Sequence, residues 1–571
     1  MGNSAMDPYD FIGIGFGPSN LALAVAADEL DPARRFAFFE QSPRLRWHPG
    51  MMIEGSRMQI SFLKDLATLR NPGSPYTFLQ YARAKGRLEK FVNLGEFRTT
   101  RLEYQDYLRW VAGFFADRVA YSTRVTRVTP VRRRGEQEYR LFRVEVENAA
   151  TGERDSHYAA NVVHAAGGRP RFPEGCHRGS PGVIHSSDFL TALPDSFPDR
   201  SKSYDFAVVG DGQSAGEIVG YLLKNFPAAR VHLCLSGYAL RATDNNPFVN
   251  EQFYGENAYE FHARDDDGRT ALLKELRNTN YGVVEAGFLD ELYRLVYAEE
   301  VQGRRRLITH PFSRVTRTDP AGGAVTLTLT DLMGGPDRML RCDGVMLATG
   351  YDRGIDREIF GDVLEFMDPG DATEPQVSHD YRVRTRPELA GGLYVQGYAQ
   401  HAFGLGDTLL SLLPFRSARI FSHICAHTPN APRVRRAPAS YPPKRYVEDD
   451  PEKIYAIVER FNFATVISAR GDQDAVVTHV PVTLDRSRGA KGVLFGHMDR
   501  SNPHADLIDG RTVTVLFHGP NAYISPHALG RSVLPTWNSL NVHARGTGRL
   551  VIDRAELVRG LGGICEQSDP E

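Results

Sequence analysis

The hydrophobic pattern at the start of the chain predicts a strand, a tight turn and a helix. An apolar run from Tyr9 to Gly13 breaks at GIGFGPSN, and apolar residues then return at helical spacing from Leu21 to Ala27. A second short apolar run, Arg35 to Phe39, is expected to form another strand. Together these segments predict a βαβ unit.

The same order of segments occurs again near residue 200. Strand, turn and helix are expected at Tyr204–Val209, at GDGQSAGE and at Ile218–Leu223, followed by a strand at Arg230–Leu235. Val345–Leu347 adds a buried strand that runs into a glycine turn. Two βαβ units predict an α/β fold with two Rossmann-like dinucleotide-binding domains.

The pattern changes near residue 430. Residues 426–444 are rich in proline and basic residues and lack apolar periodicity, which is typical of a linker. Short β-branched runs separated by turn residues follow, which predicts a small antiparallel barrel; these runs are 464–468, 476–482, 493–495, 513–517 and 548–552. We therefore expect one α/β unit over residues 1–425 and a barrel over 445–571.

Composition narrows the partners of the protein. The 571 residues are 42% apolar and 24% charged, and 68 Lys plus Arg nearly cancel 70 Asp plus Glu. There is thus no general attraction to nucleic acid or to a membrane surface, and small molecules are the expected partners. The N-terminus has no secretion signal and no segment reaches the ~18 apolar residues of a membrane span, so we expect a cytoplasmic protein. Its five dispersed cysteines fit that compartment; they are Cys176, Cys234, Cys342, Cys425 and Cys565.

The first glycine motif predicts an FAD site. Gly13, Gly15 and Gly17 allow a sharp turn close to a pyrophosphate, and Pro18 begins the helix whose N-terminus receives the charge. Glu40 ends the next strand, where its carboxylate can accept hydrogen bonds from ribose hydroxyls. We expect the FAD part to cover about 1–200 and 345–425.

The second motif predicts a nicotinamide site over about 201–344. Its contacts would come from Gly210, Gly212, Gln213 and Ser214, with Thr349 and Gly350 in the later glycine turn. The following strand ends at Ser236 without a carboxylate, and Arg241 stands nearby. These two features favour NADPH over NAD, although Arg241 could equally be a surface residue. The obvious use of two dinucleotide sites is hydride transfer from nicotinamide to flavin.

Four sequence strings resemble the microbial ornithine and lysine N-monooxygenases, over roughly residues 9–425. They are WHPGM (47–51), MQISFLKDLATL (58–69), NPFVNE (246–251) and TLLS (408–411). The resemblance implies hydroxylation of a side-chain amine, which must be the neutral free base to react, with FAD, NADPH and O₂.

The resemblance also assigns site residues. Lys64, Asn250 and Asn280 would hold the carboxylate and α-amine of L-ornithine, and Ser411 would lie at the flavin end of the pocket. Trp47, His48 and Gln59 would pack on FAD, and Arg101, Gln213 and Ser214 would contact NADPH. The residues expected to take part in catalysis are Gln59, Lys64, Asn280 and Ser411, with Leu410 as a further cofactor contact. Family members carry arginine where Ser236 stands, so the 2′-phosphate contact would depend on Arg241.

The C-terminal strings resemble a family first described as FMN-binding transcriptional regulators. The resemblance implies a split β-barrel fold, and the family includes haem-dependent piperazate synthases. The strings are THVP (478–481), GHMDRSNPH (496–504), GPNAYISP (519–526) and PTWN (535–538). Fusion to an ornithine hydroxylase favours the synthase, which would close an N–N bond in N5-hydroxyornithine to give piperazic acid. The alternative is a siderophore-type ornithine or lysine hydroxylase whose C-terminal domain binds FMN or acts as a sensor.

Haem b would need one axial ligand from the protein, and histidine is the commonest. We choose His497 because it ends a predicted strand, although a structural role is about equally expected; Arg500 and Tyr523 are weaker pocket candidates. The other histidines considered are His479, His504, His527 and His543. The chain ends earlier than this family does, so we expect a C-terminally truncated domain, and by resemblance a homo-oligomer.

Overall fold

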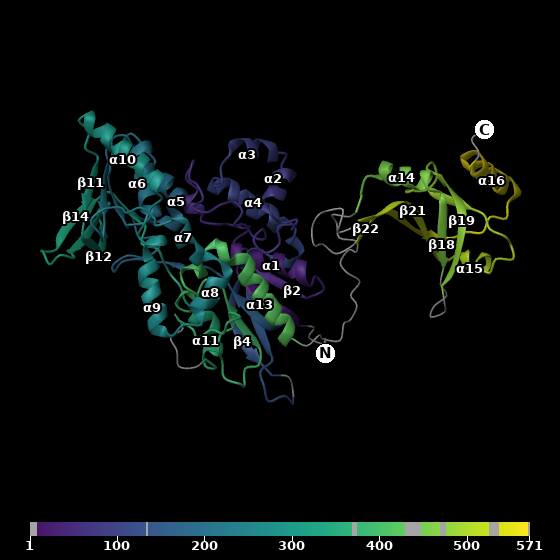
Figure 1. The fold of residues 1–571 in the computed structure, drawn as a ribbon, viewed down its shortest axis with the longest axis horizontal. Coiled ribbons are helices and arrows are strands. Elements are labelled where there is room, and N and C mark those ends of the chain that lie inside the picture. Colours follow the sequence, from purple (N-terminus) through teal and green to yellow (C-terminus); the bar gives the residue numbers. More distant parts are fainter. Residues whose placement is uncertain are drawn as a thin grey trace. The chain divides into compact units, whose positions relative to one another are not determined.

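The computed structural model describes residues 8–132, 135–367, 374–428, 447–468, 475–524 and 536–568. The chain divides into two compact units, Met1–Pro432 and Arg433–Glu571, which are considered separately (Figure 1).

The first unit contains a seven-stranded sheet that includes the strand before the first glycine motif. Its strand order is β3-β2-β1-β6-β5-β4, and β17 also pairs with β6. Strand β1 lies between β2 and β6 and is parallel to both, whereas β4, β5 and β6 are antiparallel. The strands are β1 (Tyr9–Ile14), β2 (Phe36–Phe39), β3 (Val119–Ala120), β4 (Thr123–Val131), β5 (Leu141–Asn148), β6 (Arg154–His164) and β17 (Gly392–Val395).

Helices α1 (Pro18–Leu30) and α13 (Leu413–His427) pack against each other beside this sheet. Helix α1 is apolar over most of its length, and its residues from Asn20 to Ala27 are buried. The carboxyl end of β1 and the N-terminus of α1 therefore meet where the first glycine motif was predicted to bind a dinucleotide.

A second sheet, entirely parallel, includes the strand before the second glycine motif and has the order β11-β10-β9-β15-β8. Helices α6 (Gln213–Asn225) and α10 (Ala286–Val301) pack with it, and a three-stranded antiparallel sheet, β12-β13-β14, adjoins it. The strands are β8 (Val183–His185), β9 (Asp205–Val209), β10 (Arg230–Cys234), β11 (Leu307–His310), β12 (Ser313–Ala321), β13 (Ala324–Asp331), β14 (Arg338–Cys342) and β15 (Gly344–Leu347). The predicted strands and helices of both βαβ units are thus confirmed.

Shorter elements connect these parts. Two short strands, β7 (Arg169–Pro170) and β16 (Tyr351–Asp352), pair with each other. The remaining helices of the unit are α2 (Phe78–Ala84), α3 (Leu88–Leu94), α4 (Arg101–Gly113), α5 (Phe189–Ser196), α7 (Pro247–Asn250), α8 (Gly255–His262), α9 (Asp266–Glu275), α11 (Arg357–Leu364) and α12 (Gln400–Phe403).

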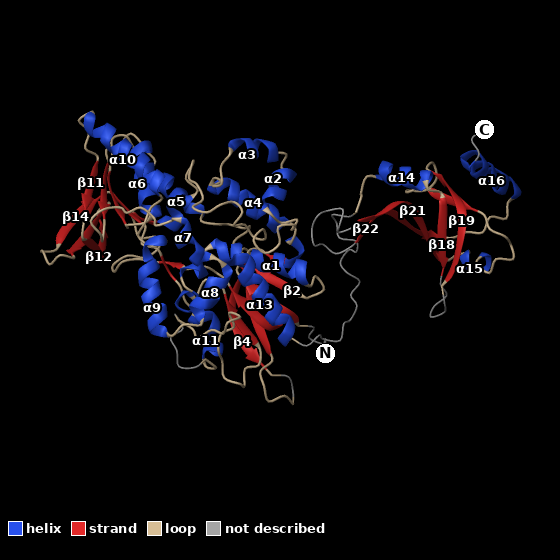
Figure 2. Cartoon of the chain, viewed as in Figure 1, coloured by secondary structure: helices blue, strands red, loops and turns tan. Residues whose placement is uncertain are grey.

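The second unit is a curled antiparallel half-barrel sheet with the order β20-β19-β18-β21-β22 (Figure 2). One face carries the core, which includes Ala464, Val466, Val480 and Phe517. The strands are β18 (Phe463–Ser468), β19 (Val476–Asp485), β20 (Val493–Gly496), β21 (Thr512–Ile524) and β22 (Thr536–Thr547), and the helices are α14 (Pro451–Arg460), α15 (Ala505–Ile508) and α16 (Arg554–Ser568). The fold class predicted for both units is confirmed.

One predicted strand in this unit is wrong. The run 548–552 lies outside the sheet, and the partner of β21 is the preceding segment, β22. The sequence of β22, TWNSLNVHARGT, is mostly polar and small, so its apolar pattern did not reveal it. Among the described helices of the chain, none is long and apolar enough to cross a membrane.

Candidate active site and cofactor-binding residues

The first glycine motif forms a cradle between β1 and α1. Gly15 has φ of 81°, and a Cβ there would lie 2.8 Å from the carbonyl oxygen of Ala165. At Gly17, the N-cap of α1, no atom lies within 4 Å of the Cβ position. The turn is thus closed on its sheet side and open at the helix N-terminus, which fits the pyrophosphate of FAD.

Glu40 follows β2, as predicted. Its Oε2 accepts a hydrogen bond from the Phe16 N–H at 2.8 Å, and its Oε1 accepts one from the Ser42 N–H at 2.8 Å. These bonds fix the carboxylate beside the first turn, and each oxygen keeps acceptor capacity for a ribose hydroxyl. The ribose contact itself stays a prediction.

Trp47 and His48 lie together at the start of a short 3-10 helix, Pro49–Met51. Their ring centroids are 5.2 Å apart, and His48 has a left-handed backbone with φ of 45°. Surrounding protein lowers the pKa of His48 to about 4, helped by the positive charges of Arg101 and Arg353. His48 is therefore neutral at physiological pH and can pack on an aromatic cofactor without bringing a charge.

The second glycine motif repeats this geometry between β9 and α6. A Cβ on Gly210 would lie 2.5 Å from the carbonyl oxygen of Ala348, whereas the Cβ position of Gly212, the N-cap of α6, has no neighbour closer than 3.9 Å. Ser214 lies in the first turn of that helix. In the later glycine turn, the Thr349 hydroxyl donates to the Arg171 carbonyl at 2.6 Å, and Gly350 has φ of 78°.

The structure adds an acid to this site. Strand β10 ends at Cys234 with no acid directly after it, and the Asp211 carboxylate accepts hydrogen bonds from the Ser236 N–H at 2.9 Å and from its hydroxyl. Sequence reasoning missed this acid because it lies inside the glycine motif. The Arg241 side chain is exposed, and its backbone carbonyl accepts from the Val284 N–H at 2.8 Å.

Three predicted cofactor residues contact one network between the two nucleotide-binding parts. Arg101 donates to both carboxylate oxygens of Glu217 at 2.7 Å. The Gln213 amide donates to Glu217 at 2.8 Å and accepts from the Gln59 amide at 2.9 Å. Arg101, Gln59 and Gln213 are thus brought together, with Glu217 as a member that the sequence did not reveal.

Lys64 and Asn250 lie in neighbouring segments. The Lys64 ammonium is 5.4 Å from the centroid of the Tyr254 ring, which closely follows Asn250, and partial burial lowers the pKa of Lys64. The Asn250 amide donates to the Asn245 carbonyl at 2.7 Å, which leaves its own carbonyl oxygen able to accept.

Ser411 and Asn280 come from two further segments. Ser411 is buried in the 3-10 turn Leu410–Leu412, which leads into α13. Asn280 ends the 3-10 turn Leu276–Thr279, and the next residue, Tyr281, donates to the Gln400 side chain. The roles of Ser411, Leu410 and Asn280 stay predictions.

Sequence reasoning also missed a buried ion pair beside the first cradle. Arg416 on α13 and Asp407 are 2.9 Å apart, with side chains 1% and 0% exposed. Arg416 donates to the Ser19 hydroxyl at 3.0 Å and to Gln396, whose amide reaches Asn20 in the first turn of α1. A charged residue within the apolar run LLPFRSARIF was the available signal.

In the second unit, His497 directly follows β20 and is exposed. The next residue, Met498, packs on the core of the unit. His504 is fully buried, with Nδ1 2.9 Å from the Thr478 hydroxyl and Nε2 2.9 Å from the Ser468 hydroxyl. Burial lowers the pKa of His504, and both ring nitrogens are engaged, which indicates a structural role.

The remaining histidines divide as follows. His479 lies 3.0 Å from the Thr465 hydroxyl, and His518, which the sequence did not single out, lies 3.4 Å from the same hydroxyl. His543 is exposed on β22, as are Arg500 and Tyr523 elsewhere in the unit, and His527 lies outside the described residues. Within the described ranges, no group of three or more His, Cys, Asp or Glu side chains is arranged to hold a metal ion. Axial ligation of a haem iron by one histidine would need no such group.

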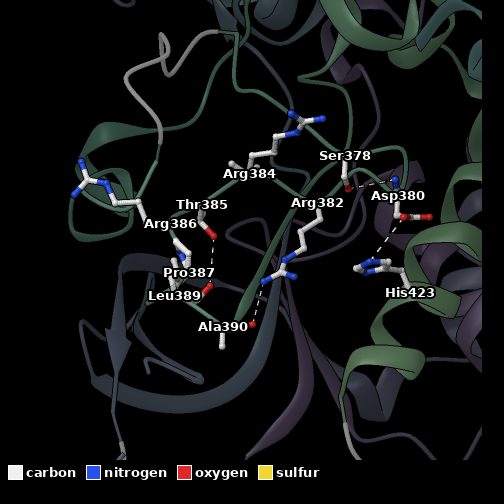
Figure 3. A pocket seen from close by; sticks show the side chains of 11 residues that line it. Ser378, Asp380, Arg382, Arg384, Thr385, Arg386, Pro387, Leu389, Ala390 and His423 are labelled. Carbon is white, nitrogen blue, oxygen red and sulfur yellow. Dashed lines mark hydrogen bonds and ion pairs between the residues drawn. The ribbon is translucent and has the colours of Figure 1, made fainter. Parts of the chain in front are cut away.

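A cavity of about 560 Å³ lies away from these residues (Figure 3). Arg382, Arg384 and Arg386 line it together with His423, whose ring nitrogen is 3.7 Å from Asp380. None of the predicted site residues lines this cavity.

The fold and the two cradles define a flavoprotein oxidoreductase with two dinucleotide sites. Residues 7–353 match the family model described as L-lysine 6-monooxygenase/L-ornithine 5-monooxygenase. The chain belongs to this family of flavin-dependent, N-hydroxylating monooxygenases. Residues 440–571 match a model described as "Putative FMN-binding domain". The two family resemblances read from the sequence are thereby confirmed.

Curated relatives cover the first unit. The L-ornithine N(5)-monooxygenase of Cochliobolus heterostrophus is 38% identical over 455 residues, 72% of this chain and 85% of that protein. That of Burkholderia cepacia is 40% identical over 440 residues, 75% of this chain and 97% of that protein.

Solved structures agree with these matches. The ornithine hydroxylase PvdA of Pseudomonas aeruginosa has a TM-score of 0.68 at 34% identity, covering 73% of this chain and 99% of that one. The ornithine N-hydroxylase KtzI of Kutzneria sp. 744, described with reduced FAD, NADP⁺ and L-ornithine, has a TM-score of 0.69 at 36% identity, covering 73% and 99%.

Proposed function

We propose that the first unit is an L-ornithine N5-monooxygenase that uses FAD, NADPH and O₂. The observation that carries this proposal is the similarity, over nearly the full length of its relatives, to ornithine N5-monooxygenases. The two open cradles at Gly17 and Gly212 support FAD and a nicotinamide dinucleotide. KtzI, with NADP⁺, supports NADPH as the donor.

In this proposal the protein orients the amino acid and keeps its side-chain amine reactive. Lys64 binds the α-carboxylate, and the carbonyl oxygens of Asn250 and Asn280 accept from the α-ammonium. The half-buried Lys64 and the buried Ser411 indicate a pocket in which desolvation favours the neutral N5 amine. FAD, when bound, supplies the oxygen and hydride chemistry.

Product analysis tests this function. The protein is incubated with NADPH, O₂ and either L-ornithine or L-lysine, and the products are identified by mass. We expect N5-hydroxyornithine, with a larger kcat/KM for ornithine than for lysine. One methylene corresponds to about 1–3 kcal/mol, so a preference of roughly 10- to 200-fold is expected. Hydroxylation of lysine with equal efficiency would contradict the substrate assignment.

We further propose that the second unit is a haem-dependent piperazate synthase acting on the hydroxylated product. The observation favouring it is His497, an accessible imidazole directly after β20. The other candidate, binding of FMN or a sensing role, takes its support from the family model that residues 440–571 match.

The visible spectrum after haem supplementation separates the two candidates. A Soret band that is lost in His497→Ala supports haem on His497, and His543→Ala is the matched control on another exposed histidine. A spectrum with flavin absorption and no Soret band after haem supplementation argues against haem and favours the FMN or sensing candidate. A Soret band unchanged in His497→Ala would reject His497 as the ligand.

A further inference from the structure

Where the two nucleotide-binding parts meet, a buried ion pair joins the start of α4 to the second turn of α6. Arg101 is the first residue of α4, and its guanidinium binds both oxygens of Glu217 at 2.7 Å. It also donates to the Met51 carbonyl at 3.1 Å. The side chains are only 14% and 4% exposed, so the pair is bidentate and largely shielded from water.

The first turn of α6 is tied to the FAD part by a second route. Gln213 lies one turn before Glu217 and donates to its carboxylate. The side-chain oxygen of Gln213, Oε1, accepts hydrogen bonds from the Gln59 side-chain amide at 2.9 Å and from the Glu285 backbone N–H at 2.8 Å. Gly212 caps the same helix, so both sets of contacts hold the cradle for the second dinucleotide. One runs from Met51 through Arg101 to Glu217, and the other runs from Gln59 to Gln213.

Glu217 is poorly suited to contact the dinucleotide itself. An unpaired carboxylate one turn inside a pyrophosphate-binding helix would oppose the favourable potential at the helix N-terminus. Arg101 neutralises that charge and at the same time fixes the helix. The resemblance to the family assigns Arg101 to NADPH directly, but its donors in this structure point to a protein carboxylate and a carbonyl.

We propose that Arg101 and Glu217 are positioning residues that set the distance between the two cradles. The inference rests on the proposed hydride transfer from NADPH to FAD. Hydride transfer requires the donor and acceptor atoms in near-attack geometry, and a displacement of about 1 Å can cost roughly 100-fold in rate. The pair therefore governs the rate of flavin reduction more than the affinity for NADPH.

Anaerobic stopped-flow reduction of the FAD-loaded protein tests this inference. Glu217→Gln keeps the shape of the side chain but removes its charge. We expect the limiting rate constant at saturating NADPH to fall about 10- to 100-fold, with the Kd for NADPH changed less than threefold. Arg101→Lys, which keeps the charge but loses the bidentate geometry, should show an intermediate fall. The double variant Arg101→Gln/Glu217→Gln should reduce flavin no more slowly than the slower of its two single variants, Arg101→Gln and Glu217→Gln.

The matched control is Arg127→Gln. Arg127 forms a bidentate pair with Asp362, but that pair is exposed and lies wholly within the FAD part. The Arg127→Gln variant should leave the rate of flavin reduction unchanged. A direct NADPH contact would instead give a raised Kd in the Arg101 variants and an unchanged or lower Kd in Glu217→Gln. That pattern of Kd values would overturn the proposal. So would a limiting rate constant that stays within twofold of the unmodified protein in both Glu217→Gln and Arg101→Lys.

Hydrogen–deuterium exchange gives a readout that needs no cofactor. In the protein without nucleotide, amides in the first two turns of α6 should exchange faster in Glu217→Gln than in Arg127→Gln. A protein that never oxidises NADPH would contradict the proposed function, whereas unchanged exchange would contradict the positioning role alone.

Discussion

Removing the positive charge of Arg416 should strongly destabilise the first unit. The Arg416 and Asp407 side chains are 1% and 0% exposed, so Arg416→Met leaves a carboxylate in the interior without its cation. The Ala399 N–H, 2.8 Å from Asp407, remains as a donor but carries no full charge. Breaking a buried pair by removing one partner typically costs about 3–5 kcal/mol. Because native stabilities are about 5–15 kcal/mol, this is a large fraction of the total.

The assay is thermal unfolding followed by near-ultraviolet circular dichroism at saturating FAD. At roughly 2–4 °C per kcal/mol for domains of 150–250 residues, the cost corresponds to a fall in Tm of about 6–20 °C, with the lower end expected for this larger unit. Arg416→Met also removes the bond to the Ser19 hydroxyl in the first turn of α1, so the affinity for FAD should fall.

Two comparisons make this prediction specific. The double variant Arg416→Met/Asp407→Leu removes both charges and should recover part of the lost stability, since an apolar pair can replace a buried ion pair. Arg127→Gln breaks an exposed pair and should leave Tm nearly unchanged. The reasoning is refuted by a loss below about 1 kcal/mol in Arg416→Met, or by a double variant whose loss equals the sum of the single losses.

Three further predictions concern the cradle, the substrate and pH. Gly15→Ala should yield protein without FAD, because its Cβ would lie 2.8 Å from a backbone oxygen at a φ of 81°; normal FAD content after purification would contradict this. Lys64→Ala should raise KM for ornithine at least tenfold, because a charge-assisted bond of about 1.5–3 kcal/mol is lost, and an unchanged KM would remove Lys64 from the carboxylate role. Burial lowers the pKa of His164 to about 4, so the unfolded state binds more protons between pH 6.5 and 4. The contribution of His164 to the free energy of unfolding should be complete above pH 6.5 and about 3 kcal/mol smaller near pH 4. In urea unfolding at a series of pH values, His164→Phe should make the free energy of unfolding depend less on pH over this range. An unchanged pH dependence would reject His164 as the source.

The sequence predicted those elements whose signal is local. The strands and helices around both glycine motifs came from short apolar runs and from glycines whose spacing is fixed by the turn itself. The family strings located the loop that contains Lys64 and Gln59. In each case the residues that carry the signal are neighbours along the chain.

The missed features depend on partners that are distant in sequence. Arg416 meets Ser19 across 397 positions, and Arg101 meets Glu217 across 116. The sequence can mark a single charge, such as Arg416 within its apolar run, but no periodicity along the chain identifies the distant residue that pairs with it. Strand β22 was missed for a related reason, since its place in the sheet is set by pairing with β21 and not by its own apolar pattern.

The two cradles hold their carboxylates in different ways, and this difference bears on cofactor choice. Glu40 lies beyond its glycine motif and is bound by the N–H groups of Phe16 and Ser42, so it stands at the strand end where a ribose would lie. Asp211 lies within its motif and is bound by the N–H and hydroxyl of Ser236. In both cradles each carboxylate oxygen accepts one protein hydrogen bond, so the two sites differ in where the acid stands and not in how many bonds it accepts. No acid corresponding to Glu40 directly follows β10, so we expect a cation such as Arg241 to serve the ribose end of the second site, where it would favour a 2′-phosphate over a free hydroxyl.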